Sequence, residues 1–189
     1  MKAYQFKLVS TPGSNLMFGK PYLEKKAASE THAQFEERCW PQKVAVDANG
    51  QCVISGFAVK NAIEAAASRL QIKVPSSKGT FTKLFKQGIL SYGPFALTSH
   101  QGKPLTIKEV ETLLLFVPSD GKRGSGKRVE RIFPQVALWS TIVEIHVLDH
   151  RITQEILAEH LAEVGRYIGF GSMRVENGGM NGRFSVTEV

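Results

Sequence analysis

Residues 165–184 read GRYIGFGSMRVENGGMNGRF, and the interpretation of the whole chain begins with this stretch. It contains six glycines in twenty residues, interleaved with arginines and with Asn177. An amphipathic helix precedes it and a short alternating strand follows it, so the stretch is a loop between regular elements rather than a tail. Glycine tolerates positive φ and lets another backbone come close. We therefore expect the main chain of this loop to contact a large, negatively charged partner such as nucleic acid.

Two amphipathic helices have matching apolar stripes. The helix before the loop is expected at about 154–168 with Thr153 as its N-cap, and the other at about 56–70 with Ser55 as its N-cap. Apolar residues three or four positions apart lie on one helix face. The stripes are Val59, Ile63, Ala66 and Leu70 in one helix, and Leu157, Leu161, Val164 and Ile168 in the other. Both helices are expected to pack on one sheet.

Four segments have the pattern of strands. Residues 3–9 and 182–188 alternate between apolar and polar, 138–148 is a long apolar strand, and the nearly continuous apolar run 110–117 suits a central strand. The order strand, helix, strand, strand, helix, strand is that of the split βαβ, ferredoxin-like fold. The sequence thus predicts an α+β, RRM-like domain with a four-stranded antiparallel sheet and both helices on one face.

The remaining segments are interpreted as insertions into a single domain of residues 1–189. One covers about 10–50 and includes a short helix at 30–38. Another covers 71–109 and includes a short helix at about 80–87. A length of 189 residues is ordinary for one domain with a real core.

Composition narrows the class of protein. The chain is 42% hydrophobic and 22% charged, which is typical of a soluble globular protein, and its net charge of +7 fits an anionic partner. No apolar run reaches the roughly 20 residues of a membrane span, and the N-terminus lacks the pattern of a signal peptide. We expect no membrane association and a cytoplasmic location, with Cys39 and Cys52 as free thiols.

Residues 118–131, PSDGKRGSGKRVER, predict a basic, glycine-rich hairpin. Five cations in this hairpin exceed what a soluble turn needs, although a turn with solubilising charges is the alternative. Lysine and arginine neutralise phosphates and release counterions, and arginine also stacks on bases. The five are Lys122, Arg123, Lys127, Arg128 and Arg131.

Two segments resemble the RAMP superfamily, RNA-binding ferredoxin-like proteins that include CRISPR effector backbone subunits and crRNA-processing endoribonucleases. VISGFAVKNAIEAAA (Val53–Ala67) is similar to the family's strand, Ser/Gly turn and helix, with Lys60 at the place of its basic residue. IGFGSMRVENGGMNGRF (Ile168–Phe184) is similar to its C-terminal glycine-rich loop. The C-terminal segment also looks like small bacteriophage proteins.

The resemblance implies the partners. Backbone subunits of this family stack head-to-tail along a strand, and such a heterologous contact gives open filaments. It therefore implies a homo-oligomer on single-stranded RNA or DNA, with a CRISPR or phage protein as a further possible partner. Besides the hairpin cations, the residues expected to bind the strand are Lys60, Lys83, Arg166, Gly169, Gly171, Arg174, Asn177, Gly178, Gly179 and Arg183.

Catalysis has little support in the sequence. No His/Cys spacing fits zinc, and no metal or cofactor is expected. A metal-independent ribonuclease of this fold needs a histidine near a Tyr, Ser or Lys as general acid and base, and His32 is the best candidate. His160, between Glu159 and Glu163, is expected at the surface.

The leading hypothesis is a non-enzymatic protein that coats single-stranded RNA or DNA with little sequence preference. One alternative is an endoribonuclease of the same fold. Another is a structural phage protein, or an inhibitor of a host complex, with no nucleic-acid affinity of its own. The choice between RNA and DNA depends on 2′-hydroxyl contacts and stays open.

Overall fold

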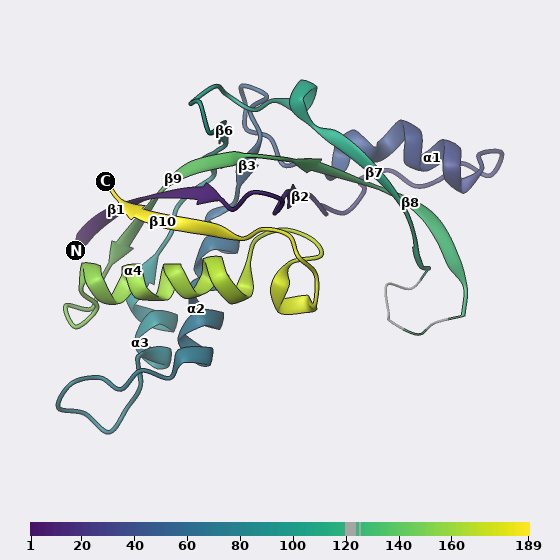
Figure 1. Cartoon of the computed structure of the whole chain (residues 1–189). Helices are drawn as coiled ribbons and strands as arrows, with labels where there is room; N and C mark the ends of the chain where they lie inside the picture. Colours follow the sequence, from purple (N-terminus) through teal and green to yellow (C-terminus); the bar gives the residue numbers. More distant parts are fainter. Residues whose placement is uncertain (120–123, 125) are drawn as a thin grey trace.

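The main sheet of the computed structural model, which describes residues 1–119, 124 and 126–189, has the ferredoxin-like strand order (Figure 1). In chain order its core comprises β1 (Lys2–Ser10), α2 (Gly56–Leu70), β4 (Ile89–Leu90), β9 (Trp139–Val147), α4 (Gln154–Glu163) and β10 (Phe184–Glu188). The strands lie in the order β10–β1–β9–β4, and each neighbouring pair is antiparallel. A further short strand, β6 (Thr98–Ser99), pairs with the other end of β9. The predicted α+β, ferredoxin-like class is confirmed.

Helices α2 and α4 both cover the same face of this sheet (Figure 1). Oγ of Ser55 accepts a hydrogen bond from the Ala58 N–H, and Oγ1 of Thr153 accepts one from the Ile156 N–H, so both predicted N-caps are confirmed. The predicted stripes are buried, apart from the partly exposed Leu70 at the end of α2. They pack on the inward side chains of the sheet, which include Phe6, Leu8, Val143 and Ile145. Burial of these apolar surfaces holds the helices on the sheet.

The segment expected as a central strand at 110–117 lies elsewhere. It forms β7 (Glu111–Pro118), which pairs along its whole length with β8 (Arg128–Val136), and β8 also pairs with β2 (Leu16–Met17). The place beside β9 belongs to β4, inside the supposed insertion 71–109. An apolar run shows that a strand has apolar neighbours but not which sheet it joins. Leu114 and Phe116 of β7 are in fact exposed.

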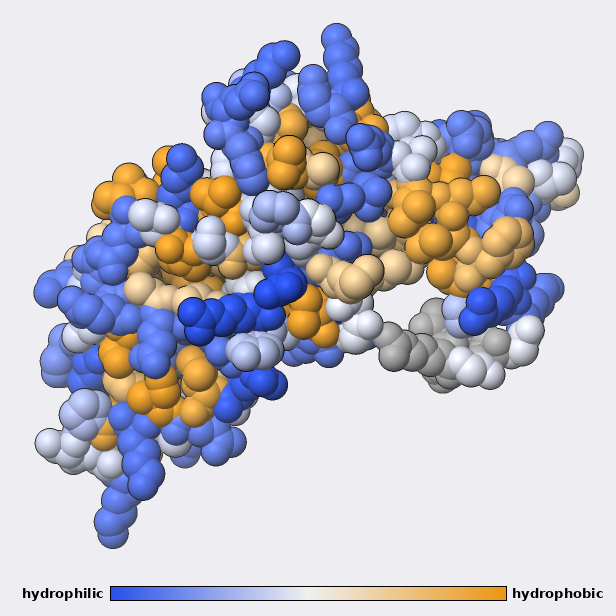
Figure 2. Space-filling view, in the orientation of Figure 1, coloured by the Kyte–Doolittle hydropathy of each residue, from blue (hydrophilic) through white to orange (hydrophobic). Residues whose placement is uncertain are grey.

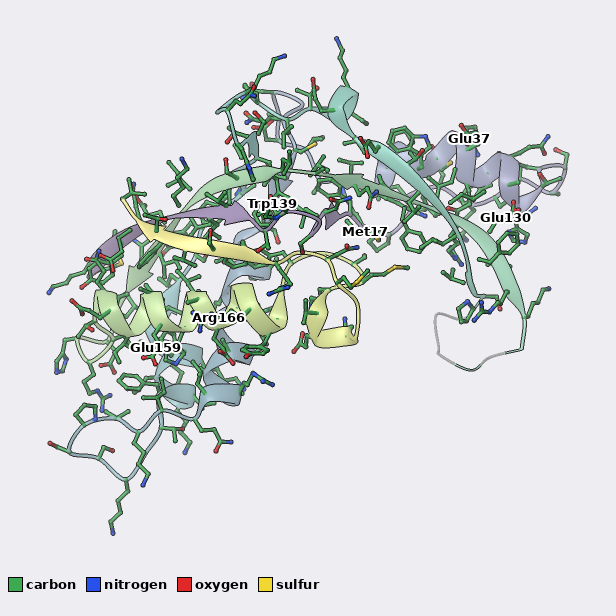
Figure 3. All side chains as sticks on the ribbon, in the orientation of Figure 1. Met17, Glu37, Glu130, Trp139, Glu159 and Arg166 are labelled. Atoms are coloured by element: carbon green, nitrogen blue, oxygen red, sulfur yellow. The ribbon has the colours of Figure 1, made fainter. Side chains whose placement is uncertain are left out.

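Strands β7 and β8 with α1 (His32–Cys39) form an arm that extends away from the main sheet, on the side opposite α3 (Phe81–Gly88) (Figure 1). Apolar side chains gather on its surface (Figure 2). Met17 lies where the arm joins the main body, whereas Glu37 of α1 and Glu130 of β8 lie out on the arm (Figure 3). Short elements complete the fold: η1 (Trp40–Lys43), β3 (Val53–Ile54) paired with β5 (Phe95–Ala96), and η2 (Ile107–Glu109).

His160 is buried rather than exposed, and the expectation of a surface histidine is wrong. Its ring lies 4.2 Å from the ring of Phe85 and 6.2 Å from that of Phe81, both on α3. The helical pattern alone marks this side of α4 as polar, because His160 lies between two glutamates in the sequence. Helix α3 covers that side and buries the histidine. Separately, none of the helices in the described part of the chain is long and apolar enough to cross a membrane.

Candidate nucleic-acid interface

The glycine-rich loop connects the end of the second core helix to β10, as the sequence predicts. Helix α4 continues into η3 (Val164–Ile168), a wider π-helical turn, and the turn ends at Gly169, whose N–H donates to the Val164 carbonyl at 2.8 Å. The loop then includes the short helix η4 (Val175–Asn177) before the chain enters β10. The loop therefore starts from a fixed point on the packed helix.

The glycines of this loop first serve contacts within the chain itself. A Cβ on Gly171 would lie 2.4 Å from the Met17 carbonyl oxygen, and the residue has φ +78°. A Cβ on Gly179 would lie 1.7 Å from the carbonyl oxygen of Met173. Next to Gly171, the N–H of Ser172 donates to the same Met17 carbonyl at 2.8 Å. The loop is thus held against the end of β2, and this close packing requires glycine.

A continuous groove runs between the loop and the start of α2. One cavity of about 360 Å³ is lined by β2 and the residues after it, by β3 and by the loop, and a second of about 380 Å³ is lined by one face of α2 and the loop. The two cavities share five lining residues, so they are parts of one groove. The shared residues are Ser55, Ala58, Phe170, Gly171 and Arg174.

The charged residues that line the groove are Lys20, Arg174, Glu176 and the buried Lys43. Arg174 donates to Oε2 of Glu176 from Nε at 2.9 Å and from Nη2 at 2.6 Å. Lys20, exposed beside the first cavity, has no acidic partner among the described residues. The first turn of α2, which Ser55 caps, lines the groove and adds the positive end of the helix dipole. Lys20 and the helix dipole therefore offer positive charge to an anion in this groove.

The structure brings only some of the predicted residues to this groove. Gly169, Gly171 and Arg174 line it, whereas Arg166 and Arg183 are exposed nearby in the chain but do not. Asn177, Gly178 and Gly179 belong to η4 and the turn after it. Lys60 points to the other side of α2 from Ala58 and Ala62, with its Nζ 3.8 Å from Glu64 Oε1, and Lys83 is exposed on α3.

The described cations of the basic hairpin lie on the arm, at the start of β8 and within it. Lys122 and Arg123 fall outside the described residues. Lys127 and Arg128 are exposed at the start of β8 and have no acidic partner in the described part of the chain. Arg131 differs from them, because its Nη1 lies 3.4 Å from Oε1 of Glu36. Among the described hairpin cations, Lys127 and Arg128 are thus the ones free to bind an anion.

No family model matches this chain, and no curated protein sequence matches it either. It is similar to a chain in the cryo-EM structure of the Type III-B Cmr-beta bound to cognate target RNA, with 8% identity and a TM-score of 0.48, over 100% of this chain and 61% of that one. It is also similar to a chain of a CRISPR RNA-guided surveillance complex, with 10% identity and a TM-score of 0.39, over 95% and 65%. The chain thus spans less than two thirds of the length of either match.

A buried ion pair joins α1 to η1, the segment that follows it in the chain, and holds both on β8. Nζ of Lys43 donates to Oε2 of Glu36 at 2.8 Å and to the Ile132 carbonyl at 2.6 Å, and the Ile132 N–H donates to Glu36 Oε2 at 2.9 Å. Burial lowers the pKa of Lys43. Burial alone would raise the pKa of Glu36, but the hydrogen bonds from Lys43 and Ile132 bring it below its ordinary value. These contacts hold α1 and η1 on β8 and so fix the base of the hairpin.

His32 lies beside the basic hairpin. It lines a cavity of about 380 Å³ together with Ser119, Lys127 and Arg131. The sequence does not predict this proximity, because neither β8 nor its contact with α1 can be recognised from the pattern of apolar residues. A serine and a lysine near a histidine are the groups that metal-independent RNA cleavage would need.

Sequence reasoning missed three residues at the groove: Lys20, Phe57 and Asn61. Lys20 lies in a segment without periodicity, so no signal distinguishes it. Phe57 could have been found from the sequence, because it is a large aromatic residue on the side of α2 opposite the buried Val59 and Ile63. An aromatic on the polar face of a helix indicates a contact beyond the core.

Proposed function

We propose that this protein binds single-stranded nucleic acid, RNA or DNA, with little sequence preference and without cleaving it. The observation that carries the proposal is the groove in which the first turn of α2 faces the loop segment Gly169–Arg174. A helix N-terminus next to backbone-rich loop and cationic side chains is a favourable environment for phosphate. The net charge of +7 favours the same kind of partner.

The arm supplies the second contact in this proposal. Its free cations, Lys127 and Arg128, are held on a strand whose base is fixed by the pair of Glu36 and Lys43. Lys122 and Arg123 add to the charge of the same hairpin in the sequence. A strand that lies in the groove and reaches the hairpin would contact phosphates at both places, and Arg166 and Arg183 would extend the basic surface.

The proposal includes a head-to-tail homo-oligomer of RAMP type along the strand. Its support within this chain is β7, whose apolar residues Leu114 and Phe116 are exposed on an edge strand of the arm. An exposed apolar edge strand is a surface that normally requires cover. A second copy on the same nucleic acid would supply that cover.

Fluorescence anisotropy with labelled single-stranded RNA, single-stranded DNA and duplex DNA of equal length, at low and high salt, tests the function. We expect binding to single strands that weakens steeply with salt, and larger particles by size-exclusion chromatography as protein is added. Absence of binding to all three at low salt would overturn the proposal. It would point instead to a structural or inhibitory role with a protein partner.

A second candidate, a metal-independent endoribonuclease, is favoured by the cavity that His32 shares with Ser119 and Lys127. It predicts cleavage of a structured RNA in the presence of a chelator, and loss of cleavage in His32→Ala. His150→Ala, which alters another exposed histidine, is the control. RNA that stays intact with the wild-type protein excludes this candidate.

A further inference from the structure

Phe57 has the most exposed aromatic ring in the described part of the chain, with 79% of the residue accessible to water. It lies in the first turn of α2, on the side away from Val59 and Ile63, so the core does not use it. No other aromatic ring among the described residues contacts it. Fully exposed phenylalanine faces are favourable contacts for other flat rings.

The ring is part of the groove rather than of a random surface. Phe57 lines the second cavity from the α2 side, and the backbone of Gly169–Gly171 forms the facing wall. Asn61, one turn further along the same face of α2, lines the cavity next to it. Between them and the loop, Ala58, Ala62 and Ala65 are too small to fill the space.

Polar groups surround this apolar ring. Arg174 lies across the cavity and carries the positive charge, and the Asn61 amide can both donate and accept hydrogen bonds. Both bonds from Arg174 go to Oε2 of Glu176, and Oε1 has no hydrogen-bond partner within the described residues. A ring face, an anion-binding group and hydrogen-bonding groups at the edge match the three parts of a nucleotide: base face, phosphate and base edge. An aliphatic or lipid ligand would leave the polar groups unsatisfied.

We propose that Phe57 is the stacking platform for one nucleobase of the bound strand, an inference that rests on the proposed single-strand binding. The base lies on the Phe57 ring inside the second cavity, its edge meets Asn61 and Glu176, and its phosphate lies toward Arg174. The stacking depends on the base's π face and not on its identity, which agrees with low sequence preference. With this stacking, the second cavity contacts the base of the bound strand as well as its phosphate backbone.

The experiment compares anisotropy binding of a normal single strand with that of the same strand made largely abasic. Wild-type protein should bind the abasic strand more weakly. Phe57→Ala and Phe57→Leu should bind the normal strand about five-fold more weakly or worse, because one stacked base contributes at least about 1 kcal/mol. Both variants should bind the abasic strand as the wild type does. Phe57→Trp should retain affinity, and its added indole fluorescence should be quenched by the normal strand and not by the abasic one.

The control is Tyr92→Ala, which removes a ring that is 65% exposed but rests on His146, outside the groove. It should leave both affinities unchanged. If wild-type protein binds single strands and Phe57→Ala binds the normal strand as tightly as the wild type does, the stacking role is wrong while the proposed function stands. If wild-type protein binds neither strand at low salt, the proposed function itself fails.

Discussion

Nζ of Lys43 lies 2.8 Å from Oε2 of Glu36, and only 8% and 5% of the two side chains are exposed. The ammonium group also lies 4.6 Å from the centre of the Tyr22 ring and 5.3 Å from that of Phe133. Both charges are therefore removed from water, and each depends on the other for compensation. Because both partners also bond to the Ile132 backbone, the packing of α1 and η1 on β8 depends on the pair.

Removing one partner should be costly. Glu36→Gln should lower the free energy of unfolding by about 3–5 kcal/mol, since it leaves the buried ammonium without its counter-charge. Adding Lys43→Met to that variant should restore part of the loss, because the uncompensated charge disappears. Glu64→Gln is the matched control: its pair with Lys60 is 3.8 Å long and about a quarter exposed, and it should cost less than about 1 kcal/mol. Urea unfolding measures all four proteins. Equal losses for Glu36→Gln and Glu64→Gln would contradict this account.

The backbone contact at Gly171 gives a second prediction. Gly171→Ala should destabilise the protein by more than Gly13→Ala, although both residues have positive φ, at +78° and +76°. Gly13 has nothing within 4 Å of its missing Cβ, so Gly13→Ala reports the strain of φ alone, about 1 kcal/mol. At Gly171 the clash with the Met17 carbonyl adds to that strain. Thermal unfolding compares the two variants with the wild type. Identical shifts in unfolding temperature would mean that the loop moves aside without cost.

Helix periodicity was sufficient to predict α2, α4 and the loop after η3, because those segments have long apolar stripes and clear caps. The apolar run of β7 did not predict its place, because a run such as TLLLFV fits a central strand and an exposed arm equally well. Helix periodicity was not sufficient for His160, because its burial comes from α3, a helix that is distant in sequence. The groove could be predicted only in part: the glycines indicated the loop, but nothing local shows that it faces Phe57 and Asn61.

Burial lowers the pKa of His160 below its ordinary 6.5, since the charged ring would lie against Phe81 and Phe85. The hydrogen bond between its Nδ1 and the Ile156 carbonyl, and the nearby Glu159 and Glu163, oppose this shift but do not cancel it. His160 therefore binds a proton more tightly in the unfolded chain than in the folded one. Its contribution to the free energy of unfolding is complete above about pH 6.5 and is lost as the pH falls below that value, by up to about 1.4 kcal/mol per pH unit. His160→Leu should reduce the loss of stability between neutral and mildly acidic pH. His150→Leu, at an exposed position, should not. The same pH dependence in all three proteins would refute the assignment.

The basic hairpin should account for part of the salt dependence. Replacing Lys122, Arg123, Lys127 and Arg128 together with alanine should weaken single-strand binding and reduce the slope of log K against log salt by about 0.7 for each cation that contacts a phosphate. The matched control replaces four lysines away from the arm, with the same change in net charge: Lys2, Lys73, Lys78 and Lys86. An equal change in slope for both variants would show that net charge, and not the hairpin, drives binding.

Arg174 and Glu176 should have opposite effects on binding. Glu176→Gln releases the Arg174 guanidinium from its ion pair and removes a negative charge from the groove, so it should tighten single-strand binding roughly two- to five-fold, the scale of an exposed ion pair. Arg174→Gln should weaken binding by a similar factor. Asp149→Asn, which breaks the 2.6 Å pair with Arg151 before the start of α4, makes the same change in net charge away from the groove. It should leave affinity nearly unchanged. Tightening by Asp149→Asn as large as that by Glu176→Gln would mean that the strand does not pass Arg174.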